Sequence, residues 1–136
     1  MTITRETRTD QLLRNALTFD GVASGLSGVA LLALAGVLAG PLGIPAAGLL
    51  GFGLFALLYG PAVLYAGTRP VINHTAARVV VGLNLLMALD SVLCAVLVDV
   101  TVAGEVALLA LAAFGVGVAA LQYAGLNRVL SRGSRA

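Results

Sequence analysis

The chain has 136 residues, of which 60% are hydrophobic and 10% are charged, and its formal net charge is +2. Soluble domains contain about 45–50% apolar and about 25% charged residues. This composition excludes an ordinary soluble domain, because a chain of this length could not bury so much apolar surface. The expected partner is the lipid bilayer, and no nucleic-acid partner is expected.

Four apolar runs follow one another along the chain. A membrane-spanning helix needs about 20 apolar residues, since ~30 Å of hydrocarbon is crossed at ~1.5 Å per residue. In chain order, the predicted spans are 17–40, 46–67, 75–98 and 103–126. The connectors are so short that neighbouring spans must run antiparallel. The sequence therefore predicts an all-α fold with a single membrane domain over 1–136, a four-helix antiparallel bundle with flexible tails at 1–9 and 129–136.

Every positively charged side chain is an arginine, and all eight gather at one end of the predicted bundle. They precede the first span, flank the connector at 68–74 or follow the last span: Arg5, Arg8, Arg14, Arg69, Arg78, Arg128, Arg132 and Arg135. The connectors at 41–45 and 99–102 contain no positive residue. By the positive-inside rule, both termini and the middle connector are predicted to lie in the cytoplasm.

Glycines at a spacing of three or four mark a packing face on the first span. They are Gly21, Gly25, Gly28 and Gly36. Helices associate in lipid through close backbone approach, which small residues permit. We interpret this face as a contact with another helix of the same chain; a dimer interface or a docking face for another protein is the alternative. The span is expected to remain uncleaved, because Asp20 interrupts the start of its apolar run.

Each span carries one polar residue at a similar depth. These residues are Asp20, Tyr65, Asn84 and Gln122, at ~5–10 Å from the predicted cytoplasmic edge. A charged aspartate in the bilayer centre costs ~3 kcal/mol, so such groups need partners. The pattern predicts one hydrogen-bonded polar layer, toward which Arg78 could also reach. Its first interpretation is structural, and its alternative is a small cytoplasm-facing site for a proton, a lipid headgroup or a quinone ring.

Asp90 is a second intramembrane acid, at ~20 Å from the cytoplasmic edge. It lies six residues after Asn84 and therefore on a different face of the third span. No basic residue occurs at its depth. Either it is protonated and bonded to its own backbone or to Ser91, or its partner belongs to another subunit or a ligand. Intramembrane acids are functional candidates by default.

Three stretches of the chain resemble a family of small bacterial four-span integral membrane proteins. They are residues 13–20, residues 82–84 together with 90–93, and residues 120–126, and they include Asp20, Asn84 and Gln122. The resemblance implies a four-helix bundle in the bacterial cytoplasmic (inner) membrane. It implies no particular activity.

No catalytic or cofactor motif accompanies these features. A nucleophile needs an adjacent base, and the single histidine, His74, has no Ser, Thr or Cys at helical spacing that would suit that role. Cys94 is the only cysteine and is interpreted as a packing residue. We expect no metal and no cofactor. Enzymatic activity is left open only as a minor alternative, a lipid-modifying membrane enzyme, because the chain lacks a catalytic set.

We expect an accessory or interaction subunit of a membrane complex. The alternative is a minimal proton-coupled or small-molecule transporter, working as a homodimer with Asp20 or Asp90 as the ion site. A transporter often has inverted internal repeats, and the different depths of these two acids weaken that alternative.

Overall fold

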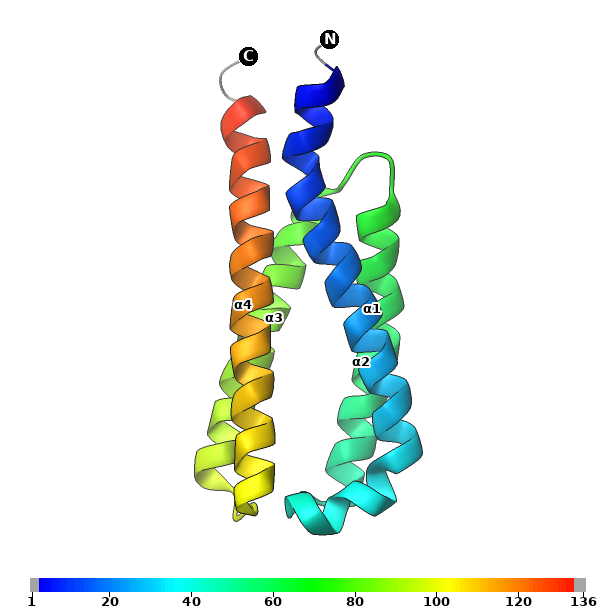
Figure 1. The fold of residues 1–136 in the computed structure, drawn as a ribbon, viewed down its shortest axis with the longest axis vertical. Coiled ribbons are helices and arrows are strands. Elements are labelled where there is room, and N and C mark those ends of the chain that lie inside the picture. The colour runs from blue at the N-terminus through cyan, green and yellow to red at the C-terminus, as the bar shows by residue number, and fades with distance from the viewer. Residues whose placement is uncertain (1–2, 134–136) are drawn as a thin grey trace.

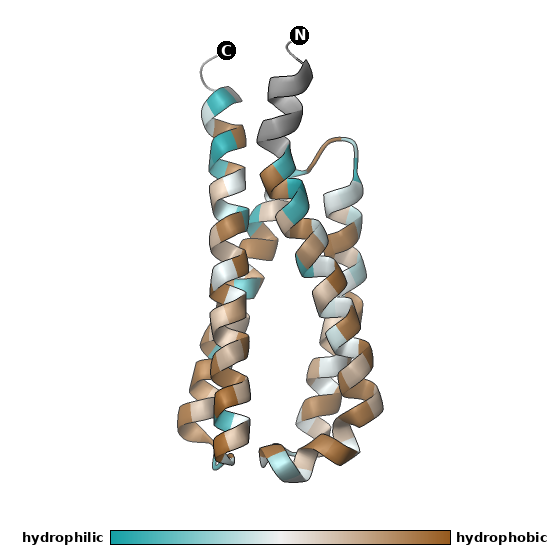
Figure 2. Cartoon of the chain, in the orientation of Figure 1, coloured by the Kyte–Doolittle hydropathy of each residue, from teal (hydrophilic) through white to brown (hydrophobic). Residues whose placement is uncertain are grey.

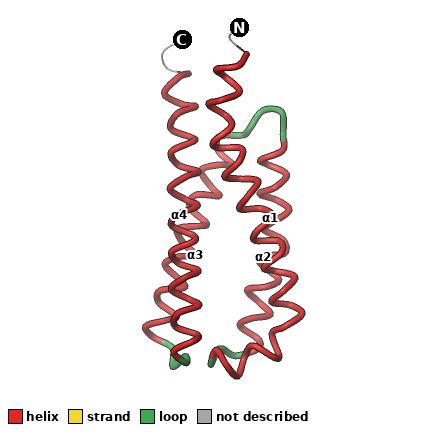
Figure 3. Tube along the Cα trace, in the orientation of Figure 1, coloured by secondary structure: helices red, strands yellow, loops and turns green. Residues whose placement is uncertain are grey.

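The computed structural model describes the backbone of residues 3–133 and the side chains of residues 11–132. Its elements are four helices, α1 (Ile3–Leu42), α2 (Ala46–Thr68), α3 (His74–Leu97) and α4 (Val102–Gly133), joined by short turns (Figures 1 and 3). Neighbouring helices run antiparallel, as predicted. Every helix contains a segment long and apolar enough to cross a membrane. The predicted all-α, four-span, multi-pass membrane architecture is therefore confirmed.

The helices extend beyond the predicted spans at both ends of the chain. α1 already begins at Ile3 and α4 continues to Gly133, so residues 3–9 and 129–133 are helical where tails were expected. The remaining tail residues lie outside the described part of the chain. Hydrophilic residues gather toward the start of α1 and the end of α4, whereas apolar residues cover the middle of the helices (Figure 2). We call this end of the bundle the termini end and the opposite end the distal end.

The bundle consists of two hairpins. α1 packs along α2 and α3 packs along α4, while α1 and α4 join the two pairs and α2 and α3 make little contact. The two hairpins lie close together near the termini end and diverge below it (Figure 1). They meet again at the distal end, where Thr101 donates from its backbone nitrogen to Leu42 O at 3.2 Å and from Oγ1 to Pro41 O at 2.6 Å.

Local signals in the sequence account for the helix ends. The Asn73 side chain accepts hydrogen bonds from the backbone nitrogens of Thr75 and Ala76 at 2.9 and 3.1 Å, which caps the start of α3. Gly43 follows the end of α1 in the left-handed region, with φ of 66°, a conformation that glycine adopts without a steric penalty. These two residues set where the third span begins and where the first one ends.

Glycine contacts bring α1 and α2 close together. A Cβ atom on Gly21 would lie 2.8 Å from the carbonyl oxygen of Gly60, and one on Gly28 would lie 2.8 Å from that of Gly53. A Cβ atom on Gly60 would in turn meet the backbone nitrogen of Gly25 at 2.5 Å. The first three glycines of the predicted packing face thus lie at the contact with α2. The fourth, Gly36, is exposed, and its backbone is not among the atoms that a Cβ atom on an α2 glycine would meet, whereas the backbone of Gly25 is.

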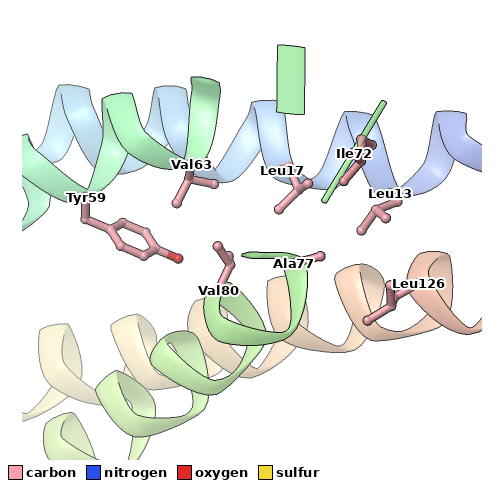
Figure 4. Close-up of a cluster of buried hydrophobic side chains, with 8 residues drawn as sticks. All are labelled: Leu13, Leu17, Tyr59, Val63, Ile72, Ala77, Val80 and Leu126. Atoms are coloured by element: carbon pink, nitrogen blue, oxygen red, sulfur yellow. The ribbon is translucent and has the colours of Figure 1, made fainter. Parts of the chain in front are cut away.

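An apolar core fills the bundle near the termini end. Its buried side chains come from all four helices and the α2–α3 turn: Leu13, Leu17, Tyr59, Val63, Ile72, Ala77, Val80 and Leu126 (Figure 4). Arg14 closes this end, because its guanidinium donates to the carbonyls of Gly67, Arg69 and Pro70 at 2.8, 2.6 and 3.2 Å. A cation at these carbonyls also matches the negative end of the α2 dipole.

Candidate functional site

Asp20 is the centre of a buried polar cluster that joins all four helices. Its side chain is 0% exposed. Oδ2 accepts hydrogen bonds from Tyr59 Oη of α2, Asn84 Nδ2 of α3 and Gln122 Nε2 of α4, each at 2.9 Å. Oδ1 accepts from Ser24 Oγ, one turn further along α1, at 3.1 Å. The structure thus brings together three of the four residues of the predicted polar layer, Asp20, Asn84 and Gln122.

All four donors to the Asp20 carboxylate are electrically neutral. The two oxygens of the Asp20 side chain accept four hydrogen bonds between them, three at Oδ2 and one at Oδ1. No arginine takes part among the described residues: Arg14 is bonded to backbone carbonyls, and Arg78 is exposed on the surface of α3. The expectation that Arg78 could reach down to Asp20 is therefore corrected. The cluster is a set of dipoles around one acid without a counter-charge.

Asn84 has one unsatisfied atom in this cluster. Its Nδ2 donates to Asp20 Oδ2 and also to Gln122 Oε1, the latter at 3.0 Å. Its Oδ1 is buried and has no hydrogen-bond partner in the described part of the chain. A buried acceptor left without a partner costs about 1–3 kcal/mol. Asn84 Oδ1 is thus the one buried side-chain acceptor among the described residues that no hydrogen bond satisfies.

Tyr65 does not belong to the cluster, and Tyr59 takes the place that was predicted for it. Tyr65 is 62% exposed, and its hydroxyl accepts a hydrogen bond from Arg69 Nη1 at 2.8 Å. The Arg69 guanidinium also lies 5.1 Å from the Tyr65 ring centroid. Six residues turn an α-helix by about 600°, so the two tyrosines point in directions about 120° apart. Matching residues by depth alone ignores this rotation.

Signals for Tyr59 and Ser24 were present in the sequence. Gly53, Gly60 and Gly67 repeat every seven residues and mark the face of α2 that meets α1, and Tyr59 precedes the middle glycine. Ser24 lies four residues after Asp20, the spacing at which two side chains meet on one face of a helix. The ring of Phe55 stacks on that of Tyr59, with centroids 5.5 Å apart.

The apolar core separates the polar cluster from the termini end. Leu13 and Leu17 precede Asp20 on α1, Val63 follows Tyr59 on α2, and Leu126 follows Gln122 on α4. Figure 4 shows the Tyr59 hydroxyl pointing from α2 into the space between the helices. The side chains of this core therefore cover the cluster on the side that faces the termini end.

Asp90 has an entirely different environment. It is exposed on the surface of α3, about two-thirds of the way along the helix, and no described residue forms a hydrogen bond or an ion pair with it. The adjacent Ser91 is buried and donates to Met87 O at 2.8 Å. Ser91 is therefore not the partner of Asp90. Exposed leucines, Leu86 and Leu93, lie one turn away on either side.

The remaining candidates add no further site. Within the described residues, no three His, Cys, Asp or Glu side chains gather in a way that could hold a metal ion. His74 is exposed at the start of α3, and Cys94 is half-buried near its end.

Comparison with protein-family models, with curated proteins and with solved structures gives no match. The candidate sites among the described residues are the buried cluster around Asp20 and the exposed Asp90.

Proposed function

We propose that this protein is an accessory or interaction subunit of a membrane complex and that it docks through the face of α3 around Asp90. The observation that carries the proposal is the position of this acid. It lies on the outer surface of a membrane-spanning helix, among leucines, with no partner among the described residues. An aspartate in such a place costs up to about 3 kcal/mol when the surroundings are lipid.

The chemistry of the face indicates the kind of partner. The described arginines lie at the termini end, so none is at the depth of Asp90. A second copy of the chain would bring another Asp90 and no cation. A transmembrane helix with a basic or amide side chain in its apolar span is the complementary surface. When such a partner binds, Asp90 forms an ion pair or a hydrogen bond instead of facing lipid.

The arginine distribution supports an orientation in a bacterial cytoplasmic membrane with the termini end inside. Single cysteines in a Cys94→Ser background test it. A cysteine at Val71, which is 82% exposed in the α2–α3 turn, should react with an impermeant maleimide only after the membrane is opened. One at Asp99, exposed in the α3–α4 turn, should react in intact cells. The opposite pattern would reverse the proposed orientation.

The Asp20 cluster favours one alternative function, a minimal proton-coupled transporter. The acid is buried without a counter-charge, and Asn84 Oδ1 is a free acceptor beside it. A proton or a small donor arriving at this point would find both groups. Asp20→Asn separates the two functions: it should abolish proton-coupled flux in a transporter, and it should leave the composition of a complex unchanged if the cluster is structural.

The docking proposal is tested by quantitative co-purification in mild detergent from the native host. We expect Asp90→Leu to lose the chains that co-purify with the wild type, and Asp90→Asn to retain part of them, because an amide still forms hydrogen bonds. Asp99→Asn removes an acidic charge from an exposed turn and is the matched control. Equal recovery with Asp90→Leu and the wild type would contradict the proposal.

A further inference from the structure

A groove runs between α3 and α4 near the termini end. It encloses about 390 Å³. Its lining includes Arg78, Val81 and Gly82 of α3 and Tyr123, Asn127 and Leu130 of α4. The lining combines the cationic Arg78 and two polar side chains with apolar ones. We propose that this groove binds an anionic phospholipid, with the headgroup phosphate on Arg78 and the upper part of an acyl chain along the apolar lining.

Arg78 supplies the contact to phosphate. Unlike Arg14 and Arg69, which are bonded within the chain, Arg78 has no hydrogen bond or ion pair with any described residue. A guanidinium carries five N–H donors in a planar fork that matches two phosphate oxygens at once. Tyr123 and Asn127, both exposed, add a hydroxyl and an amide to the lining of the groove. No acidic side chain lines the groove to compete for the guanidinium.

The depth of Arg78 suits a headgroup. It lies four residues after His74, where α3 begins, which is about 6 Å along the helix. Tyrosine at this level is typical of the membrane interface. Val81, three residues further along α3 and away from the termini end, adds an apolar side chain to the lining, and Gly82 leaves room, because nothing lies within 4 Å of a Cβ atom built on it. A soluble phosphate would use Arg78 alone, whereas a phospholipid would also use this apolar part.

A second groove, between α2 and α3, has similar residues and provides an internal comparison. It is lined by Tyr65, Arg69 and Asn73, among others. There, however, the guanidinium already donates to the Tyr65 hydroxyl and stands over its ring. A lipid would have to displace these contacts. Binding of anionic lipid is therefore assigned to the groove at Arg78.

Native mass spectrometry of the purified full-length protein tests the assignment. Phosphatidylglycerol and phosphatidylcholine with identical acyl chains are titrated in the same detergent. The wild type should bind phosphatidylglycerol in preference. Arg78→Gln should weaken that binding by about tenfold, the change expected for one charge-assisted contact. Arg128→Gln removes the same charge from an exposed position at the same end but does not line the groove, so it should keep the preference.

A second variant tests the groove without altering charge. Gly82→Leu places a side chain in the open space and should also reduce phosphatidylglycerol binding, with the melting temperature of the protein retained. Equal losses of phosphatidylglycerol binding in Arg78→Gln and Arg128→Gln would refute the site at Arg78 and indicate general charge attraction instead. Undiminished phosphatidylglycerol binding in Gly82→Leu would refute the assignment of the lipid to this groove. Full competition by glycerol 3-phosphate at the lipid's own concentration would assign the site to a soluble phosphate instead.

Discussion

The contribution of the Asp20 hydrogen bonds to the free energy of unfolding can be measured by comparing two neutral replacements of this residue. Asp20→Asn removes the charge but keeps a carbonyl oxygen that can take the position of Oδ2 and accept from Tyr59, Asn84 and Gln122. Asp20→Leu removes both the charge and the acceptor. The difference in unfolding free energy between the two variants therefore reports on the acceptor at this position, because neither variant carries the acid.

The size of this difference follows from the contacts. Asp20 accepts three bonds from other helices. Interhelical hydrogen bonds in membranes average ~0.6 kcal/mol each, which gives ~2 kcal/mol for three. Donors that stay buried without an acceptor add to this, at about 1–3 kcal/mol for each such group. We expect Asp20→Leu to be less stable than Asp20→Asn by about 2 kcal/mol or more.

Reversible unfolding in mixed micelles, with increasing fractions of denaturing detergent, measures the difference. Asp90 supplies the matched control, because it is exposed and has no bond to any described residue. At position 90, the leucine variant should therefore not be less stable than the asparagine variant by a comparable amount of unfolding free energy. Equal stability of the two Asp20 variants would refute the view that the cluster holds the hairpins together. The same view would be refuted if the Asn and Leu variants of Asp90 differed in unfolding free energy by as much as those of Asp20.

Three further substitutions test the packing and the hydrogen bonds, each by thermal or detergent unfolding of the purified protein. Tyr59→Phe should cost ~0.6 kcal/mol by losing one buried bond, whereas Tyr65→Phe, at an exposed pair, should leave stability unchanged. Gly28→Ala should destabilise by about 1–3 kcal/mol because its Cβ atom would lie 2.8 Å from a carbonyl of α2; Gly36→Ala has open space and should be neutral or stabilising, and equal effects would contradict the contact. Thr101→Val should cost ~1 kcal/mol by removing the cap of α4 and the bond to the end of α1; an unchanged melting temperature would exclude that tie between the hairpins.

The number and direction of the spans could be predicted because bilayer thickness sets helix length and short connectors set antiparallel order. The polar layer was predictable only in part. Depth along the chain brought Asp20, Asn84 and Gln122 together, since residues at one level of a bundle can meet when they point inward. It selected Tyr65 instead of Tyr59, because depth says nothing about rotation about the helix axis. The glycine repeat on α2 carries that information.

Other features follow from the packing of the two hairpins and have no local signal. Hydropathy does not reveal that the apolar core lies between the cluster and the termini end, or that Arg14 reaches the carbonyls at the end of α2. The exposure of Asp90 could not be predicted, because its six-residue offset from Asn84 indicated a different face of the helix but left open whether its partner lies in its own backbone, in Ser91 or outside the chain. The groove at Arg78 depends on the relative placement of α3 and α4.

Site-specific photo-cross-linking in native membranes tests most directly whether the face of α3 around Asp90 is a docking surface. A photoreactive residue replaces Leu86 or Leu93, which are exposed one turn from Asp90, or Leu58, which is 68% exposed on α2 and serves as the control. We predict a discrete protein adduct from the two α3 positions, lost in Asp90→Leu and absent at Leu58, whose partner has a basic or amide side chain within a membrane span. Lipid adducts alone at all three positions would contradict the proposed function.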